Sequence, residues 1–244
     1  PSDGEHDKNY YVLLQQLEYS QWLGIFRRAQ ALGEAVPVIP GPIGLYRADY
    51  LRRILNEKSV KSVTEDFEIT LHLYKENLKV GYTDDARCIT VAPKSFPSFW
   101  NQRLRWYIGW LHNSLSIHKE IFFKKTWLSL YMWYAIILGY GSDFLELAAL
   151  FGIPIFFIFA PDKLFFLINL AIYLLLVIGV GTVFQAVALK FSYGKYNHTN
   201  LLFYSPFYYI LRIINLLAHA TSLIRYLFGD RAVSYTHLTL PTKA

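Results

Sequence analysis

The sequence contains very little cysteine and little charge. Cys88 is the one cysteine among 244 residues, which excludes an internal disulfide framework and any metal site built from several cysteines. Charged residues make up 17% of the chain, whereas soluble globular domains carry about 25%. Hydrophobic residues make up 54%, and the net charge of +6 is not gathered into the basic stripe that nucleic-acid binding requires. We therefore expect an integral membrane protein with membrane lipid around it and no nucleic-acid partner.

The apolar residues are concentrated in the second half of the chain. Residues 1–125 have the mixed composition of a globular domain, whereas residues 126–230 contain almost all of the long apolar runs. The run over 164–189 carries no formal charge and is long enough for a tilted membrane-spanning helix. A longer run over 128–159 predicts one span plus an interfacial stretch, and a weaker run covers 203–228. The sequence thus predicts about three transmembrane or interfacial helices.

The number of true crossings stays open. If the first part of the chain is cytoplasmic, three full crossings place Arg225 and Arg231 on the outer side. That arrangement runs against the tendency of basic residues to stay inside. Either the bias fails here, or one of the apolar segments lies flat in the interface.

Both ends of the sequence differ from those expected of an intact protein. The sequence starts at Pro1, without an initiating Met or a signal peptide. Residues 233–244 resemble a translated sequencing adapter, so we interpret them as a non-native tail and exclude them from fold reasoning. We expect a fragment that is truncated at both termini.

Several short periodic segments, separated by proline and glycine, make up residues 1–125. The pattern predicts, in chain order, a helix over 10–31, a strand, tight turn and strand over 36–47, a helix over 49–55, a helix over 65–76 with Thr64 as N-cap, a strand pair or a strand and loop over 80–91, and a helix from about 98 to 115. This mixture indicates an α/β arrangement. So few strands indicate only part of one domain.

A carboxylate pair, Glu65 and Asp66, opens the helix predicted over 65–76. A positioned carboxylate can accept the proton of an attacking hydroxyl, which typically accelerates a reaction by about 10²–10⁴-fold. The same residues also suit a plain helix start, because the helix dipole favours acids in the first turn. The motif alone leaves both interpretations open.

A second group, Gln102, Arg105 and Trp106, lies shortly before the apolar half of the chain. Residues three apart share a helical face, so Gln102 and Arg105 point the same way. An arginine fork suits phosphate groups, and an aromatic plate suits the apolar face of a sugar. The alternative is an interfacial helix whose aromatic residues lie at the membrane surface while Arg103 and Arg105 extend toward water.

Taken in order, Gly41-Pro42-Ile43-Gly44, Thr64-Glu65-Asp66 and Gln102-x-x-Arg105-Trp106, followed by membrane helices, resemble the family 2 glycosyltransferases of the membrane-embedded synthase type. Cellulose, chitin, hyaluronan and poly-N-acetylglucosamine synthases belong to that family. The resemblance implies a partial GT-A domain, its acceptor half, over residues 1–125, followed by a transmembrane region over 126–230.

The resemblance also implies a role for each motif. Asp66 would be the catalytic base, with Thr64 and Glu65 in support. Gln102, Arg105 and Trp106 would bind the leaving diphosphate and the acceptor, and Gly41, Pro42 and Gly44 would form the acceptor loop. The implied reaction is inverting transfer from a UDP-sugar to a growing polysaccharide, with the catalytic part cytoplasmic. A polysaccharide or a lipid is the expected acceptor.

The implied cofactor is Mg²⁺ or Mn²⁺, with ligands expected upstream of residue 1, so we expect this fragment alone to be inactive. His72, His112 and His118 show no metal-ligand spacing, and we interpret them as structural or solvated. Two alternatives stay open. The chain could belong to a non-processive transferase that forms a glycolipid, or to a non-catalytic membrane protein in which the motifs occur by chance.

Overall fold

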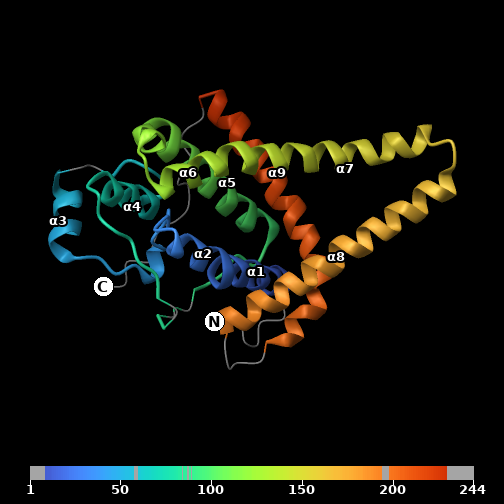
Figure 1. The fold of residues 1–244 in the computed structure, drawn as a ribbon, viewed down its shortest axis with the longest axis horizontal. Coiled ribbons are helices and arrows are strands. Elements are labelled where there is room, and N and C mark those ends of the chain that lie inside the picture. Colours follow the sequence, from blue (N-terminus) through green and yellow to red (C-terminus); the bar gives the residue numbers. More distant parts are fainter. Residues whose placement is uncertain are drawn as a thin grey trace.

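The computed structural model describes residues 9–57, 60–83, 85–86, 88, 90–193 and 198–229. The expected non-native tail over 233–244, together with Arg231, lies outside the described residues. The α-helices, in chain order, are α1 (Tyr10–Gln21), α2 (Arg27–Leu32), α3 (Ala48–Glu57), α4 (Glu65–Lys75), α5 (Phe96–His112), α6 (Trp127–Tyr134), α7 (Gly141–Phe159), α8 (Lys163–Tyr193) and α9 (Tyr208–Leu227). They are arranged as Figure 1 shows.

Short π-helical and 3₁₀ segments connect several of these helices. The π-helical segments are η2 (Trp22–Phe26), η4 (Asn113–Ile117) and η6 (Ala135–Tyr140), and the 3₁₀ segments are η3 (Gly41–Ile43), η5 (Lys119–Phe123) and η7 (Thr199–Phe207). The helix predicted over 10–31 is therefore confirmed as the continuous run α1–η2–α2. The helices predicted over 49–55, over 65–76 and from about 98 to 115 are confirmed as α3, as α4, and as α5 with η4.

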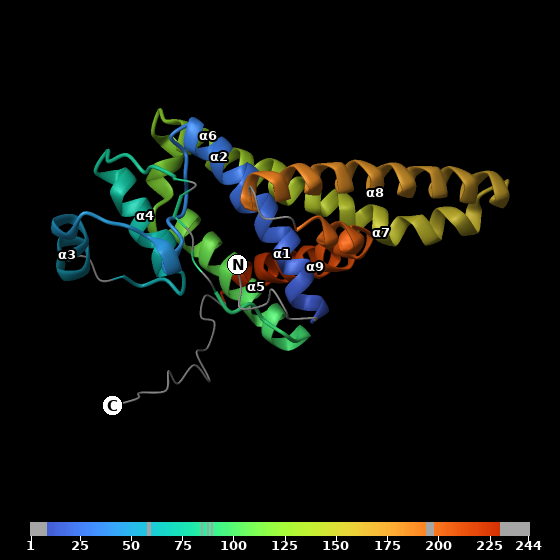
Figure 2. The same ribbon diagram turned by 90° about the horizontal axis from the view of Figure 1, so that it is seen from below.

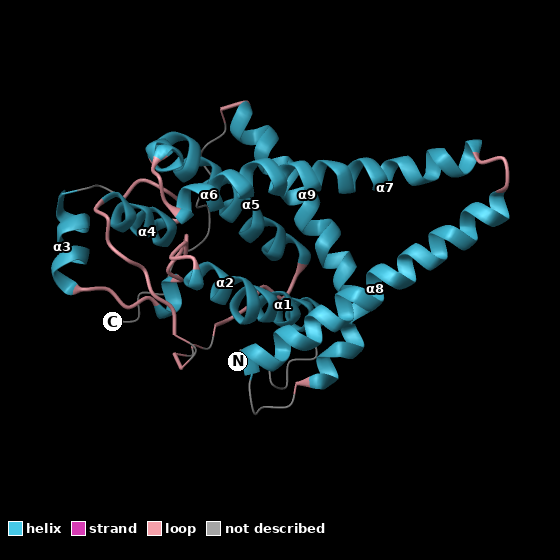
Figure 3. Cartoon of the chain, viewed as in Figure 1, coloured by secondary structure: helices cyan, strands magenta, loops and turns pink. Residues whose placement is uncertain are grey.

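The predicted strands are wrong for the part of the chain that the structure describes, which contains only helices and loops (Figure 3). Over 36–47, Pro37 and Pro40 lack the N–H that a strand ladder needs. Side chains of α4 bind this backbone instead. The Ile39 N–H donates to Thr70 Oγ1 at 2.9 Å, and the Tyr74 hydroxyl donates to the Val36 carbonyl at 3.0 Å. The described residues of 80–91, all but 84, 87 and 89, are likewise extended or bent without pairing, so the α/β class is not confirmed.

Three helical segments are long and apolar enough to cross a membrane: Trp127–Phe159, Lys163–Ser192 and Thr199–Leu227. The second has the highest mean hydropathy, 2.6. Helices α7 and α8 project from the rest of the chain as a hairpin, which opens toward the body in Figure 1 and is seen edge-on in Figure 2. Its sides are largely exposed apolar residues, as expected of a surface that faces lipid.

The charged residues within the apolar segments pair with one another. Arg212 of α9 donates to Asp143 at 3.0 Å and to Glu146 at 2.7 Å, both on α7. His219 also contacts the Asp143 carboxylate. Because an isolated charge is costly in lipid, this pairing explains how α7 and α9 carry acids and bases in otherwise apolar runs. The third segment is also the most buried of the three, since α9 packs along α5.

Helix α5 lies at the centre of the body and contacts elements from both ends of the chain. Its Phe99 is fully buried against Leu14 of α1 and Leu211 of α9. A second apolar cluster joins α4, η5 and α6 through Phe67, Leu71, Ile121, Phe122, Leu128 and Met132. Trp110 of α5 packs against this second cluster and stacks on Phe67, which places the first turns of α4 beside α5.

Candidate functional site

Asp66 lies in the first turn of α4, beneath the loop that contains η3. The Gly41 N–H donates to Asp66 Oδ2 at 3.3 Å, and the Phe67 N–H donates to Asp66 Oδ1 at 2.8 Å. Gly41 and Pro42 are exposed, whereas Asp66 is half-buried. The predicted base and the predicted acceptor loop are therefore in direct contact, at the surface of the body.

The environment of Asp66 favours a basic carboxylate. Burial raises the pKa of Asp66, and the nearby Glu65 adds to that rise. The N–H groups of Phe67 and Gly41 and the positive charge of Arg105 act in the opposite direction, but burial prevails. A carboxylate with a raised pKa is a stronger proton acceptor than one in water.

Two residues that the sequence analysis did not single out surround Asp66. Burial, followed by the negative charge of Asp66, raises the pKa of the Tyr46 phenol to about 12. Burial lowers the pKa of Arg27 in α2, while the charge of Asp66 acts against that shift, so a second cation lies within electrostatic reach of the carboxylate. Arg27 follows η2 at the end of a long helical run, where the sequence pattern alone gives no sign that it turns inward.

Gly44 is required for steric reasons and not for its backbone conformation. Its φ of −71° is accessible to any residue. A Cβ there would lie 2.7 Å from the Tyr46 ring and 2.9 Å from Ile39. The glycine therefore allows this loop to fold closely onto itself above α4.

Thr64 joins α4 to α5. It occupies the N-cap position of α4, as predicted, but its side chain makes no capping hydrogen bond. Instead, Thr64 Oγ1 accepts a hydrogen bond from Asn113 Nδ2 at 2.9 Å. Gly109 of α5 faces the same side chain so closely that a Cβ at this position would overlap it. The two helices thus meet where a glycine and a buried threonine allow close approach.

The face of α5 that meets α4 is the one that carries the predicted motif. Gln102, Arg105, Trp106 and Gly109 are three, four and seven positions apart and so share one side of the helix. Arg105 Nη1 donates to the Val63 carbonyl at 3.3 Å, just before α4. The amide oxygen of Gln102 is buried and accepts no hydrogen bond from the described residues.

The opposite contact of α5 is a buried ion pair that the sequence analysis missed. Arg103, 3% exposed, donates to Glu18 of α1 at 2.5 Å. Asn215 of α9 donates to the other Glu18 oxygen at 2.8 Å. The Arg103 guanidinium also lies 4.4 Å from the centres of both the Phe99 and Trp106 rings. A signal was present, because Arg103 lies four residues after Phe99 and Glu18 lies four after Leu14, on the apolar faces of their helices.

The structure brings Asp66, Thr64, Gly41 and Arg105 into one neighbourhood, with Glu65 exposed beside them. Trp106 lies half-buried on the same side of α5 as Arg105. That Asp66 and Trp106 line a common cavity stays a prediction.

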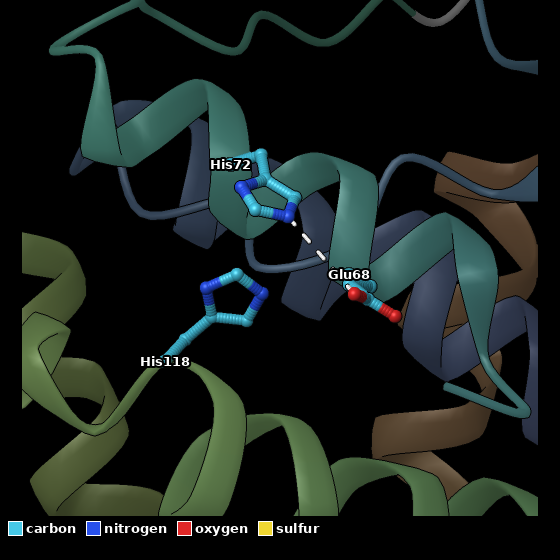
Figure 4. Close-up of side chains that lie close together, drawn as sticks. All are labelled: Glu68, His72 and His118. Atoms are coloured by element: carbon cyan, nitrogen blue, oxygen red, sulfur yellow. Dashed lines mark ion pairs between the residues drawn. The ribbon is translucent and has the colours of Figure 1, made fainter. Parts of the chain in front are cut away.

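The described residues do not fit the divalent ion that the resemblance implies. Mg²⁺ prefers oxygen ligands and binds substrate phosphates through one or two carboxylates. The described cluster with metal-ligand chemistry is Glu68, His72 and His118, which is buried and rich in nitrogen (Figure 4). A nucleotide diphosphate cannot reach it, so no step of the chemistry proposed for this chain passes through that ion. His72 and His118, which the sequence analysis interpreted as structural or solvated, are both buried, and the fold brings their ring centres to 4.6 Å from each other.

Known proteins share parts of this sequence. Human hyaluronan synthase 3 is 27% identical over 123 residues, which cover 46% of this chain and 22% of that protein. The poly-beta-1,6-N-acetyl-D-glucosamine synthase of Staphylococcus epidermidis is 27% identical over 96 residues, 39% of this chain and 23% of that protein. Hyaluronan synthase 2 of Xenopus laevis is 26% identical over 148 residues, 56% of this chain and 26% of that protein. The chain thus spans about a quarter of the length of these curated relatives.

A family model covers most of the chain, including α4, α5, the first two apolar segments and most of the third. It matches residues 3–224 and is described as glycosyl transferase family group 2. The chain belongs to glycosyl transferase family group 2.

Proposed function

We propose that this chain carries the acceptor side of an inverting glycosyltransferase, which moves a sugar from a UDP-sugar to a growing polysaccharide at the membrane. The observation that carries the proposal is the position of Asp66. Its half-buried carboxylate is held by Gly41 and Phe67 and faces the charge of Arg105. The similarity to a hyaluronan synthase and to a poly-beta-1,6-N-acetyl-D-glucosamine synthase supports a polymer as the product.

In the proposed reaction, Asp66 accepts the proton of the acceptor hydroxyl while that oxygen attacks the anomeric carbon. The bond between the anomeric carbon and the diphosphate oxygen breaks, and UDP leaves with the electron pair. Attack from the side opposite the leaving group inverts the anomeric configuration. The raised pKa of Asp66 suits this role, which is typically worth about 10²–10⁴-fold in rate.

Arg105 and Gln102 are proposed to bind the leaving diphosphate. Negative charge develops on that group as the bond breaks, and a preorganised cation stabilises it. Arg105 has a fixed anchor in the Val63 carbonyl and lies beside α4. The buried Gln102 amide oxygen has no donor among the described residues, so a ligand can complete its hydrogen bonding.

Trp106 is proposed as the platform for the terminal sugar of the acceptor. Its indole is held from behind by the Arg103 guanidinium, whose own position is fixed by Glu18. A rigid aromatic surface of this kind can stack on the apolar face of a pyranose. The exposed Gly41-Pro42 loop is proposed to border the same acceptor from the side of α4.

The proposed location of this site is the cytoplasmic side of the membrane, within the acceptor half of a GT-A domain. The three apolar segments begin at Trp127, soon after α5 and the two short segments η4 and η5, which supports a site at the membrane surface. The described residues form helices and loops, so the proposal requires that residues outside them form the strands of the GT-A domain.

The test is transfer activity in the intact protein, reconstituted in lipid vesicles with UDP-N-acetylglucosamine and UDP-glucose in turn. We expect Asp66→Asn to lower kcat by at least about 10²-fold, because the amide cannot accept the proton. Asp49→Asn is the matched control, since Asp49 is exposed and pairs with the neighbouring Arg47 at the surface. Full activity of the Asp66→Asn protein would refute the assignment.

Product length tests the second half of the proposal. A ladder of oligosaccharides and polymer supports a processive synthase, whereas a single glycolipid product overturns it. Trp106→Ala should raise the KM for acceptor oligosaccharides and shorten the polymer, because the terminal sugar loses its stacking surface.

A further inference from the structure

Glu68, His72 and His118 form a compact buried cluster that the proposed reaction does not use. Each offers one ligand atom, and these atoms all lie within 4.8 Å of one another. Glu68 and His72 are four residues apart and therefore share one face of α4. His118 comes from the end of η4, so the cluster joins two elements that are distant in sequence (Figure 4).

Charge balance at Glu68 calls for a cation. The Glu68 residue is 1% exposed, and its Oε2 accepts the N–H groups of Lys61 and Ser62 at 2.9 and 2.6 Å. Its other oxygen faces His72 Nε2 at 4.0 Å. A buried carboxylate is strongly unfavourable unless a positive charge compensates it. Either a protonated imidazole or a bound metal ion supplies that charge.

The ligand types select among metals. Two imidazole nitrogens and one carboxylate oxygen suit Zn²⁺ and related transition metals, whereas Mg²⁺ and Ca²⁺ prefer oxygen alone. The arrangement of two ligands four residues apart on a helix, with a third from another element, is one that zinc proteins use. Each imidazole binds a metal through one nitrogen and keeps the other for a hydrogen bond to a neighbouring group, so both rings can serve.

We propose that Glu68, His72 and His118 bind a zinc-class divalent ion that holds α4 against the segment following α5. Zinc–ligand bonds of about 2.0–2.1 Å bring tetrahedral ligand atoms to about 3.3 Å from one another, so binding draws the three side chains together by about 1 Å. A fourth ligand completes the shell. Ser114 Oγ and Asn113 Oδ1 are buried oxygens on the same segment that have no hydrogen bond to described residues, and a water is the other source.

The position of this site gives it a structural role. Glu68 and His72 lie within two turns after Asp66 on α4, and His118 follows η4, the segment after the helix that carries Arg105. The ion would therefore fix the distance between the two helices that meet at Thr64 and Gly109. It touches neither the acceptor loop nor Trp106, so it takes no direct part in the reaction proposed above.

The direct test is the metal content of the intact purified protein. Chelator-treated protein is dialysed against ZnCl₂, freed of excess metal and analysed by elemental mass spectrometry. We expect about one zinc per chain, with X-ray absorption showing nitrogen and oxygen ligands at about 2.0–2.1 Å. His118→Ala should lose the zinc, and chelation should lower the Tm of the unsubstituted protein but not of this variant.

His112→Gln is the matched control, because His112 lies on the same segment and outside the cluster. It should retain zinc. If the His118→Ala protein does not fold, His72→Gln and the zinc-binding isotherm of the unsubstituted chain serve instead. Absence of bound zinc after dialysis, together with a Tm that chelator leaves unchanged, would overturn the proposal in favour of an imidazolium paired with Glu68. Because these measurements do not depend on turnover, they separate this proposal from the proposed transferase activity.

Discussion

Arg103 and Arg105 are two residues apart on α5, yet the fold uses them in opposite ways. Arg103 points toward α1 and α9, where Glu18 neutralises it in a buried pair. Arg105 points toward α4, where it is only half-buried, bonds a backbone carbonyl and acts on the charge of Asp66. The comparison separates two tasks within one motif. One arginine holds the helix in place, and the other keeps its charge available for a ligand.

The two helix contacts differ in the same way. The contact between α5 and α4 is made by small and neutral groups, Gly109, Thr64 and Asn113. The contact of α5 with α1 and α9 includes a buried ion pair and the apolar cluster around Phe99. Because neutral groups pack the contact of α5 with α4, Asp66 and Arg105 lie beside this contact rather than in it. Both charged groups therefore remain available to a ligand.

Removal of the Arg103 charge should produce the largest loss of stability. Arg103→Met leaves Glu18 buried without its cation, and breaking a buried pair from one side typically costs about 3–5 kcal/mol. Denaturant unfolding of the protein in detergent measures this change. A loss below about 1 kcal/mol would show that water reaches Glu18 and that the pair is not buried in solution.

Arg105→Met should give the converse result. The charge of Arg105 is half-exposed, so we expect little change in unfolding free energy but a fall in kcat of about 10²–10³-fold, the usual loss when one group that stabilises transition-state charge is removed. Side-by-side kinetics and unfolding of the two arginine variants measure the contrast. Equal effects of both variants on stability and on kcat would contradict the division of roles.

Gly109→Ala tests the close contact between α4 and α5. The new methyl group would overlap the Thr64 side chain, and overpacking of this kind typically costs about 1–3 kcal/mol. Gly139→Ala is the matched control, because a Cβ at Gly139 meets nothing within 4 Å. A Gly109→Ala protein as stable as the Gly139→Ala protein would mean that the two helices are further apart than described.

The helices of this fold could be predicted from the sequence because their apolar residues recur at helical spacing. The predicted position of α4 after Thr64 and of α5 around Gln102 is confirmed for that reason. The strand predicted over 36–47 failed because β-like residues such as Val36 and Ile39 obtain their hydrogen bonds from Tyr74 and Thr70, which no local pattern reveals.

Prediction of the site was limited for the same reason, because local sequence patterns do not reveal contacts between residues that are distant in the chain. The motifs identified Asp66 and Arg105, and the contact of Asp66 with Gly41 agrees with their proposed shared role. Arg103 was considered only as a residue extending to water, whereas Glu18, 85 residues earlier, holds it inside. His118 could not be paired with His72 from spacing, because the two rings meet only after α5 and η4 have folded back onto α4.

The most direct test of the account is the position of a bound acceptor in the intact protein. Electron cryo-microscopy in lipid nanodiscs, with an acceptor oligosaccharide and UDP, would locate its terminal sugar. The account predicts that this sugar stacks on the Trp106 indole with one hydroxyl within hydrogen-bond distance of the Asp66 carboxylate. A terminal sugar bound elsewhere, with Asp66 and Trp106 facing separate surfaces, would contradict it.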